Sequence, residues 1–121
     1  MAKVMIADDS ESVRLTLRDM VEAGKHKVVA ESVDGNDTLE KFNSVKPDVL
    51  LLDVAMPKKD GIETLVELLK YNPKAKVVMI TAHDDMDLIE NCTKIGALAY
   101  ITKPFNTDEI LQAISYAFEE K

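Results

Sequence analysis

The chain has 121 residues, which is the size of one domain, and 46% of them are hydrophobic, so it can bury a real core. Its 22 acidic and 15 basic side chains leave a net charge of −7, which argues against a general binder of nucleic acid or anionic membranes. The lone cysteine, Cys92, rules out an internal disulfide and fits a reducing cytoplasm, and no apolar run is long enough for a signal peptide or a membrane span. We expect one cytoplasmic domain over residues 1–121, with no output domain after it in this sequence.

Five short apolar runs predict strands. In chain order they cover residues 3–7, 27–32, 49–52, 77–80 and 98–101. The run at 49–52 is continuously apolar and ends at turn residues, which is typical of a central strand buried on both faces. The run at 27–32 contains more polar side chains, which indicates an edge strand.

Polar caps and glycines separate these strands from the helices that follow them. Asp34-Gly35 and Asp60-Gly61 are predicted turns. The predicted helix starts are Ser10, Asn36 or Asp37, and the capping box of Asn106 and Glu109. The helical apolar residues that we expect to face the core are Val13, Leu17, Met20, Val21, Leu39, Phe42, Ile62, Leu65, Val66, Leu69, Met86, Ile89, Cys92, Ile110, Ile114 and Phe118. Alternating strands and helices predict an α/β fold, with a parallel sheet, helices on both faces and right-handed crossovers.

Polar side chains stand where the predicted strands end. They are Asp8 and Asp9 after the first strand, Asp53 at the end of the third, Thr81 at the end of the fourth and Lys103 after the fifth. In open α/β sheets these strand ends share one edge, which is where such folds place their ligands. A carboxylate next to a core is costly unless something pairs with it, so Asp53 needs partners. The sequence therefore predicts one polar crevice built from distant segments.

That crevice combines carboxylates, a lysine and a hydroxyl. Carboxylates close together raise one another's pKa unless a cation relieves them. Oxygen ligands with few protein contacts suit Mg²⁺, which keeps several waters and bridges to phosphate. Lys103 adds a compact positive charge, and the Thr81 hydroxyl can donate to a phosphoryl oxygen. These parts suit phosphoryl transfer to a carboxylate, which depends mostly on positioning and charge neutralisation.

Each of these residues also has a plainer interpretation. Alone, Asp8 and Asp9 could cap a helix, Thr81 could do the same, and Lys103 could be solvated. Their convergence argues against those interpretations. A flavin electron carrier shares this architecture, but Asp8 and Asp9 would repel its cofactor phosphate. A haloacid-dehalogenase-like phosphatase would want an acid where Ala55 stands, and a nucleotide-binding switch would need a Walker-type glycine-rich loop that the sequence lacks.

Four motifs, in this order, resemble the response-regulator receiver domain of the stand-alone chemotaxis (CheY-like) kind. They are Asp8-Asp9, Asp53-x-x-Met56-Pro57-x-x-Asp60-Gly61, Thr81-Ala82 and Lys103-Pro104-Phe105. The resemblance covers essentially all 121 residues. It implies a (βα)5 flavodoxin-like three-layer sandwich whose five-stranded parallel sheet has the order 2-1-3-4-5. A pseudo-receiver, acting only as a scaffold, would lack one of the acids or the lysine, and all are present here.

The resemblance implies a role for each motif. Asp53 would accept a phosphoryl group in a Mg²⁺-dependent reaction, Lys103 would contact a phosphoryl oxygen, and the bond between Lys103 and Pro104 would be cis. The implied metal ligands are Asp9, Asp53 and the backbone carbonyl of Ala55, with Asp8 holding a metal-bound water. Thr81 and Tyr100 would form the switch, because Thr81 moves toward the phosphoryl group and Tyr100 turns into the space it leaves.

The resemblance also implies partners. The phosphodonor would be a sensor histidine kinase or a histidine phosphotransfer protein, and a downstream protein would bind the surface of the fourth helix, fifth strand and fifth helix. The expected output is chemotaxis or motility, while a phosphorelay intermediate or a receiver cut from a longer regulator stays open. The domain would catalyse only its own phosphorylation and dephosphorylation, so it is not an enzyme in the turnover sense. We expect a cytoplasmic monomer or a phosphorylation-dependent weak dimer that binds neither nucleic acid nor membrane.

Three positions bear on how this chain differs from the family. Ala55 and His83 stand two residues after the acceptor and the switch threonine, where the family tunes how fast the phosphoryl group is lost. Ala55 brings no polar side chain to orient a water, so we expect no strong self-dephosphorylation from it, although His83 could compensate. Cys92 falls where the family usually has alanine, which predicts a small buried residue.

Overall fold

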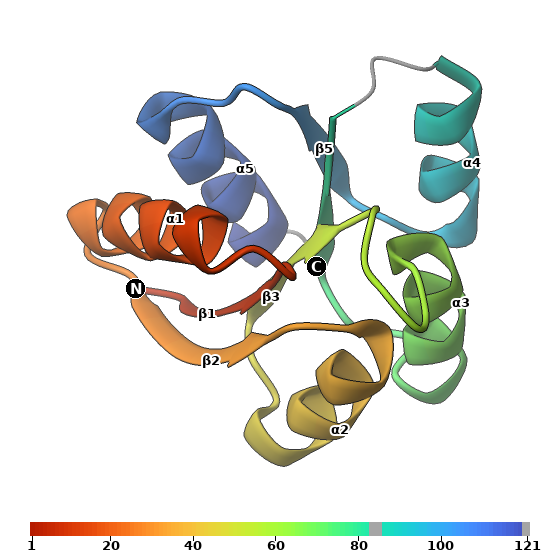
Figure 1. Cartoon of the computed structure of the whole chain (residues 1–121). Helices are drawn as coiled ribbons and strands as arrows, with labels where there is room; N and C mark the ends of the chain where they lie inside the picture. The colour runs from red at the N-terminus through yellow and green to blue at the C-terminus, as the bar shows by residue number, and fades with distance from the viewer. Residues whose placement is uncertain (83–85, 120–121) are drawn as a thin grey trace.

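The computed structural model describes residues 1–82 and 86–119 of the chain (Figure 1). The elements along these residues are β1 (Lys3–Ala7), α1 (Glu11–Ala23), β2 (Lys27–Ser32), α2 (Gly35–Val45), β3 (Val49–Asp53), α3 (Gly61–Tyr71), β4 (Val77–Thr81), α4 (Met86–Ile95), β5 (Ala99–Thr102) and α5 (Thr107–Glu119). The described strands form one parallel sheet in the order β2-β1-β3-β4-β5. The predicted α/β fold and flavodoxin-like strand order are confirmed.

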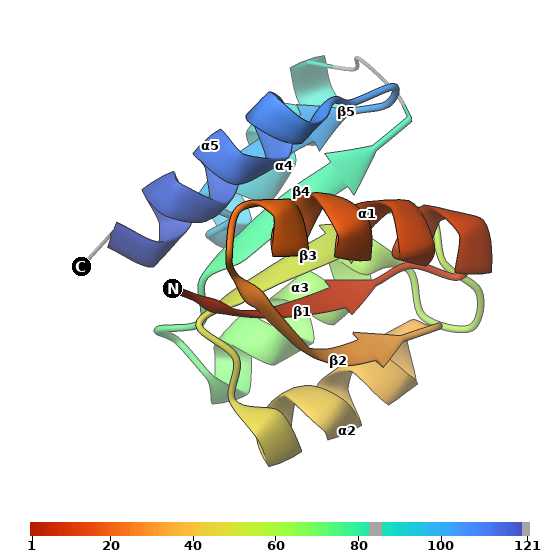
Figure 2. The ribbon, with the colours of Figure 1, turned by 90° about the vertical axis from the view of Figure 1, so that its left-hand side faces the viewer.

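Helices cover both faces of the sheet. Helices α1 and α5 lie on one face, and α2, α3 and α4 lie on the other (Figures 1 and 2). Successive residues of a strand point to opposite faces, so β1 contributes to both cores. Val4 and Ile6 join the core under α1 and α5, whereas Met5 and Ala7 join the core under α2, α3 and α4.

All the strands point the same way, so the sheet has two chemically distinct ends (Figure 2). We call the end where strands finish the carboxyl edge; its described connections are residues 8–10, 33–34, 54–60, 82 and 103–106. We call the end where strands begin the amino edge; it comprises residues 1–2, 24–26, 46–48, 72–76, 96–98 and 118–119. Helix N-termini lie at the carboxyl edge, because each helix runs back antiparallel to the strands.

Strand β3 is the central strand, as predicted. It lies between β1 and β4, and every residue from Val49 to Asp53 is buried. Strand β2 lies at the edge of the sheet, and only its last residue, Ser32, is buried. The apolar run at 49–52 and the more polar run at 27–32 therefore predicted correctly that β3 is a central strand and β2 an edge strand.

Both Asp-Gly pairs begin helices instead of forming the turns that we predicted. Asp34 and Asp60 are the N-caps of α2 and α3, and each accepts a hydrogen bond from the backbone N–H three residues later, at 2.8 and 2.9 Å. Helix α2 therefore starts at Gly35 and not at Asn36 or Asp37. The physical reason is that an N-cap carboxylate satisfies a backbone N–H that has no partner inside the helix.

The other predicted helix starts are confirmed. Ser10 Oγ accepts a hydrogen bond from the Val13 N–H at 3.3 Å, at the start of α1. Asn106 and Glu109 each accept a hydrogen bond from the other's backbone N–H, at 2.9 and 3.2 Å, which is a capping box for α5. These caps hold the two connections that carry Asp8 and Lys103.

Three residues predicted to face the core are exposed. Val66, Met86 and Phe118 are 49%, 69% and 36% exposed. Helix α3 packs through Leu65 and Leu68, which turns Val66 to solvent. Met86 is the first residue of α4, and Phe118 lies in the last turn of α5. A 13-residue helix such as α5 is about 20 Å long whereas a five-residue strand is about 16 Å, so the end of α5 extends past the sheet.

The remaining core predictions are correct. Those buried are Leu17, Val21, Phe42, Leu65, Ile89, Cys92, Ile110 and Ile114. Those partly buried against the core are Val13, Met20, Leu39, Ile62 and Leu69. The longest described helices, α1 and α5, have 13 residues each, and none among the described residues is both long and apolar enough to span a bilayer.

Candidate functional site

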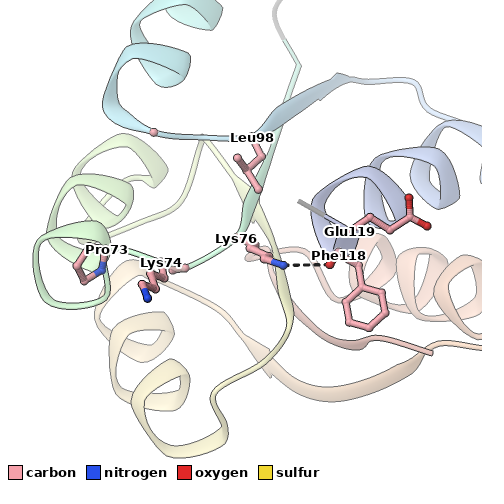
Figure 3. A pocket seen from close by; sticks show the side chains of 8 residues that line it. Pro73, Lys74, Lys76, Leu98, Phe118 and Glu119 are labelled. Carbon is pink, nitrogen blue, oxygen red and sulfur yellow. Dashed lines mark hydrogen bonds between the residues drawn. The ribbon is translucent and has the colours of Figure 1, made fainter. Parts of the chain in front are cut away.

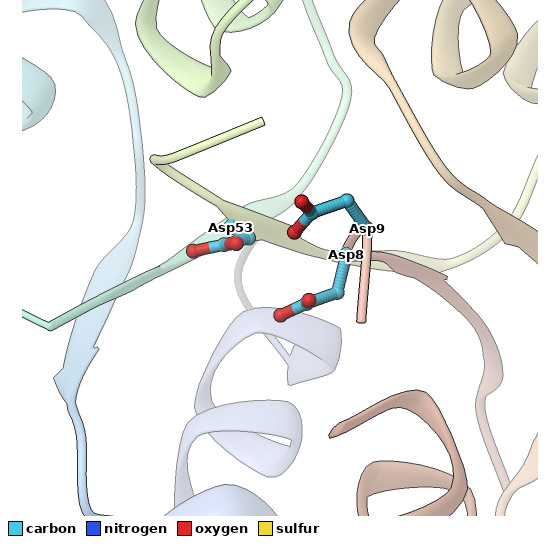
Figure 4. Close-up of side chains that lie close together, drawn as sticks. All are labelled: Asp8, Asp9 and Asp53. Atoms are coloured by element: carbon cyan, nitrogen blue, oxygen red, sulfur yellow. The ribbon is translucent and has the colours of Figure 1, made fainter. Parts of the chain in front are cut away.

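Three aspartates meet at the carboxyl edge (Figure 4). Asp8 and Asp9 follow β1, and Asp53 ends the neighbouring strand β3. One carboxylate oxygen from each residue lies within 4.8 Å of the other two. Asp8 and Asp53 are only 1% and 3% exposed, whereas Asp9 faces solvent. The adjacency of β1 and β3 thus brings together carboxylates that are 44 or more residues apart in the printed sequence.

Lys103 completes the cluster from the connection after β5. Its Nζ lies 3.5 Å from Asp8 Oδ2 and 3.6 Å from Asp53 Oδ1. The Lys103 backbone N–H donates to the Thr81 carbonyl at 2.8 Å, which ties the lysine's connection to the end of β4. Thr81 itself is buried there, and the bond between Lys103 and Pro104 is cis, as predicted.

Arg14 holds the acidic connection in place, a role that the sequence did not predict. Its Nη1 donates to the Asp8 carbonyl oxygen at 2.8 Å, and its Nε donates to Glu31 Oε1 on β2 at 3.2 Å. Arg18 pairs with the same glutamate. Asp8 Oδ1 in turn accepts a hydrogen bond from the Ser10 N–H at 2.9 Å. No local pattern signals Arg14, because its partner on β2 becomes a neighbour only through the fold.

Gly61 lets the start of α3 lie directly against the backbone of Asp53. A Cβ at Gly61 would come within 2.2 Å of the Asp53 carbonyl oxygen and 2.7 Å of Val54 Cα. The Gly61 N–H donates to the Val54 carbonyl at 2.8 Å, which fixes this approach. Glycine is required here because there is no room for a side chain. The glycine was visible in the sequence, but its contact with Asp53 was not.

Burial, and then repulsion from Asp8, raises the pKa of Asp53 to about 6, while Lys103 and the Ala55 N–H act in the opposite direction. Asp8 Oδ2 is buried without a hydrogen-bond donor, and Lys103 Nζ at 3.5 Å is the cation beside it. One ammonium thus faces two carboxylates of a cluster of three. An oxygen-only set with excess negative charge and an unsatisfied buried oxygen fits a hard divalent cation such as Mg²⁺.

Comparison with known proteins identifies the family. The chain matches the model of the response regulator receiver domain over residues 4–115. It is 36% identical over 117 residues to the chemotaxis protein CheY of Listeria monocytogenes, which covers 97% of this chain and 98% of that protein. The chain belongs to the response regulator receiver domain family. The resemblance stated from its four motifs is therefore confirmed.

Other relatives of this receiver domain agree on the fold and differ in name. Its structure has a TM-score of 0.94 to a chain in the crystal structure of the CheX-CheY-BeF3-Mg complex from Borrelia burgdorferi, at 28% identity, covering 98% of this chain and 90% of that one. The transcriptional regulatory protein PdtaR of Mycobacterium tuberculosis is 35% identical over 115 residues, which is 95% of this chain but 56% of PdtaR. Similarity alone therefore relates this receiver domain to proteins named for chemotaxis and for transcription.

The remaining residues that the sequence analysis singled out are Ala55, Tyr100, Cys92 and His83. The Ala55 N–H donates to Asp53 Oδ1 at 3.4 Å, and the Ala55 side chain faces solvent. Tyr100 on β5 is 45% exposed, so its ring lies at the surface in this structure. Cys92 is buried, as predicted. His83 lies outside the described residues.

Proposed function

We propose that residues 1–121 act as one receiver domain that accepts a phosphoryl group on Asp53 from a phosphohistidine. The donor is a sensor histidine kinase or a histidine phosphotransfer protein. The observation that supports this best is the place of Asp53: a buried carboxylate at the end of the central strand, within 3.6 Å of the Lys103 ammonium and next to two further acids. Such a set positions a nucleophile and neutralises charge, which are the main demands of phosphoryl transfer.

Asp53 supplies the nucleophile. One of its carboxylate oxygens forms the new bond to phosphorus while the phosphorus–nitrogen bond to the donor's imidazole breaks, and the imidazole nitrogen keeps that electron pair. Lys103 Nζ faces Asp53 Oδ1 and stabilises negative charge on the phosphoryl oxygens. The Thr81 hydroxyl, at the end of the neighbouring strand β4, donates to another phosphoryl oxygen. The product is a transient aspartyl phosphate.

The acids at this edge would hold Mg²⁺. Asp9, Asp53 and the backbone carbonyl of Ala55 would be its direct ligands, and Asp8 would bind it through a water. The ion would neutralise charge on the transferring phosphoryl group. The unsatisfied Asp8 Oδ2 and the spacing of the three carboxylates, within 4.8 Å, support this assignment. Arg14 contributes by fixing the backbone of Asp8.

The phosphorylated domain signals through protein contacts. Phosphorylation adds charge at the carboxyl edge and favours one of two packings, in which Thr81 moves toward the phosphoryl group and Tyr100 turns inward. The surface of α4, β5 and α5 then changes its affinity for a downstream protein. The domain catalyses only its own phosphorylation and dephosphorylation. It works in the cytoplasm, as a monomer or a phosphorylation-dependent weak dimer, without binding nucleic acid or membrane.

Chemotaxis or motility is the proposed output, supported by the 36% identity to a chemotaxis CheY that is covered almost from end to end. A phosphorelay intermediate, which passes its phosphoryl group to a histidine phosphotransfer protein, is the alternative. A receiver domain within a longer regulator is a further alternative, supported by the similarity to PdtaR, of which the match covers 56%.

Intact-mass analysis after incubation with a small phosphodonor, with and without Mg²⁺, tests the chemistry. We expect one phosphoryl adduct that requires Mg²⁺ and disappears in Asp53→Asn. Asp19→Asn is the matched control, because it makes the same change at an exposed position on α1. An adduct that survives in Asp53→Asn would refute the assignment of the acceptor. Mg²⁺ binding without any adduct would favour strict dependence on a kinase or a scaffold role.

A further inference from the structure

Lysines gather at the amino edge, opposite the proposed phosphorylation site. Its described connections contain Lys25, Lys46, Lys74 and Lys76 against Asp48 and Glu119, although the whole chain carries a net charge of −7. Lysines near helix C-termini complement the helix dipole, which explains part of this pattern. The dipole does not explain why Lys46 and Lys74 make no salt bridge to any described residue, nor why Lys74 and Lys76 border a cavity.

The cavity lies between the α3–β4 connection, the α4–β5 connection and the end of α5 (Figure 3). Its volume is about 800 Å³. Its apolar lining comes from Pro73, Ala75, Leu98 and Phe118. A concave apolar surface of this size can enclose a bulky side chain, and such pockets are where binding energy concentrates in protein interfaces.

Lys76 fixes the wall of the cavity. Its Nζ donates to the Phe118 carbonyl oxygen at 3.0 Å, which satisfies a carbonyl in the last turn of α5 and joins that turn to the start of β4 (Figure 3). Phe118 lies beyond the sheet and remains 36% exposed, so its ring contributes apolar surface at the cavity without filling it. This hydrogen bond therefore holds one side of the hollow in place.

A second hollow extends the same surface. It has a volume of about 430 Å³ and shares Pro73, Lys74 and Ala75 with the first. Its other walls include Phe42, Lys46 and Tyr71, so an apolar floor again lies beside an unpaired lysine in the described structure. Two adjoining hollows, each with a lysine at its rim, suit an extended segment several residues long better than one small molecule.

We propose that these two hollows, which we call the Lys74 groove, bind an acidic segment of a partner protein through bulky apolar side chains. Aspartates or glutamates of the segment pair with Lys46 and Lys74, and its leucine or phenylalanine side chains enter the hollows. A concave groove does not match the flat surface of a membrane. The groove lies at the end of the sheet opposite Asp53, so a partner bound there leaves the proposed phosphorylation site uncovered.

Amide chemical shifts of the ¹⁵N-labelled full chain test this proposal with three synthetic peptides. The probe is acetyl-Asp-Glu-Leu-Phe-Glu-Asp-amide; one control replaces its acids by Asn and Gln, and the other replaces Leu-Phe by Gly-Ser. We expect the probe to shift amides of Ala75, Leu98 and Phe118 with a Kd in the range of about 0.1–1 mM, and both controls to bind about tenfold more weakly.

Charge reversal separates the groove from general attraction to lysines. Lys74→Glu should weaken probe binding about tenfold, whereas the matched control Lys27→Glu, at an exposed position on β2 outside the groove, should change it less than twofold. Equal losses in both variants, equal binding of the Gly-Ser peptide, or no shifts at millimolar probe would overturn the proposal. Concentration-dependent shifts of the groove without peptide, or binding only to phosphatidylglycerol vesicles, would assign it instead to self-association or a lipid surface. Phosphoryl-adduct formation is measured separately, so failure here is distinct from failure of the proposed function.

Discussion

The two edges of the sheet differ in their backbone termini, and their charged residues are also in opposite situations. At the carboxyl edge, Asp8 and Asp53 are buried, crowded and short of cations. At the amino edge, Lys46 and Lys74 are exposed, so their ammonium groups stay hydrated and cost the fold little. A buried charge costs stability unless neighbouring groups stabilise it, whereas an exposed charge is stabilised by water and depends little on its neighbours. Substitutions should therefore have large effects at the first edge and small ones at the second.

The largest effect is expected from removing the ammonium beside Asp53. Lys103→Met should slow phosphoryl transfer from a small phosphodonor by about a hundredfold or more, because it removes the cation that stabilises charge on the phosphoryl oxygens. Time-resolved intact-mass analysis measures this rate. Lys94→Met, which removes an exposed lysine paired with Glu90 on α4, is the matched control and should react at the unmodified rate. Comparable slowing in both variants would contradict a special role for Lys103.

Gly61→Ala should be the most destabilising small substitution near the site. The new Cβ would meet backbone atoms of Asp53 and Val54 that cannot move independently, so we expect a loss of about 2–4 kcal/mol in the free energy of unfolding. Urea denaturation measures this loss. Gly24→Ala is the control, because its nearest obstacle, at 2.3 Å, is the flexible end of Leu111. If Gly24→Ala is as destabilising as Gly61→Ala, contact with the Asp53 backbone is not the cause.

Asp53→Asn should stabilise the metal-free protein, and the gain should depend on pH. Because the folded-state pKa of Asp53 is raised to about 6, above the usual 3.8, the native state binds its proton more tightly than the unfolded chain does. The carboxylate therefore costs stability as pH rises from about 4 through 6. The gain in the free energy of unfolding from Asp53→Asn should grow from near zero at about pH 4 to about 3 kcal/mol above pH 7.

Urea denaturation of both proteins in EDTA across this range checks the prediction, with Asp19→Asn as the control for loss of an exposed acid. Adding Mg²⁺ should stabilise the unmodified protein more than Asp53→Asn, since a ligand stabilises the state that binds it. A pH-independent difference between the two proteins would show that the Asp53 carboxyl does not titrate with a raised pKa.

The smallest of these effects is expected at Arg14, which acts on the site through the backbone. Arg14→Gln removes the hydrogen bond to the Asp8 carbonyl and the pair with Glu31, so Mg²⁺ affinity should fall about three- to tenfold with the acids intact. Isothermal titration calorimetry measures this change. Arg18→Gln keeps the Asp8 contact while losing its own pair with Glu31, and it should leave Mg²⁺ affinity within about twofold. Equal losses of Mg²⁺ affinity in Arg14→Gln and Arg18→Gln would mean that the pairs with Glu31, and not the hydrogen bond to Asp8, support the metal site.

Sequence patterns predicted the elements well where one local rule was decisive. The unbroken apolar run before Asp53 indicated a central strand, and the capping box at Asn106 indicated a helix start; both are confirmed. Prediction failed where a rule had two outcomes. An Asp-Gly pair can form a turn or begin a helix. Asp34 and Asp60 begin helices, because each side chain accepts a hydrogen bond from the backbone N–H three residues later. The apolar spacing of the last helix also predicted that Phe118 faces the core, but Phe118 is exposed. The spacing of apolar residues carries no information about where the sheet ends.

The sequence by itself determined the alternation of strands and helices, and hence that Asp8, Asp9, Asp53, Thr81 and Lys103 stand at strand ends. Parallel strands bring such ends to one edge, so the composition of the site followed from chain order. Only the tertiary structure decided the distances of 3.5 and 3.6 Å from Lys103 Nζ to Asp8 and Asp53, the hydrogen bond from Arg14 to the Asp8 carbonyl, and the Lys74 groove. Those depend on contacts between segments far apart in the chain, and periodicity and local propensity carry no information about such contacts.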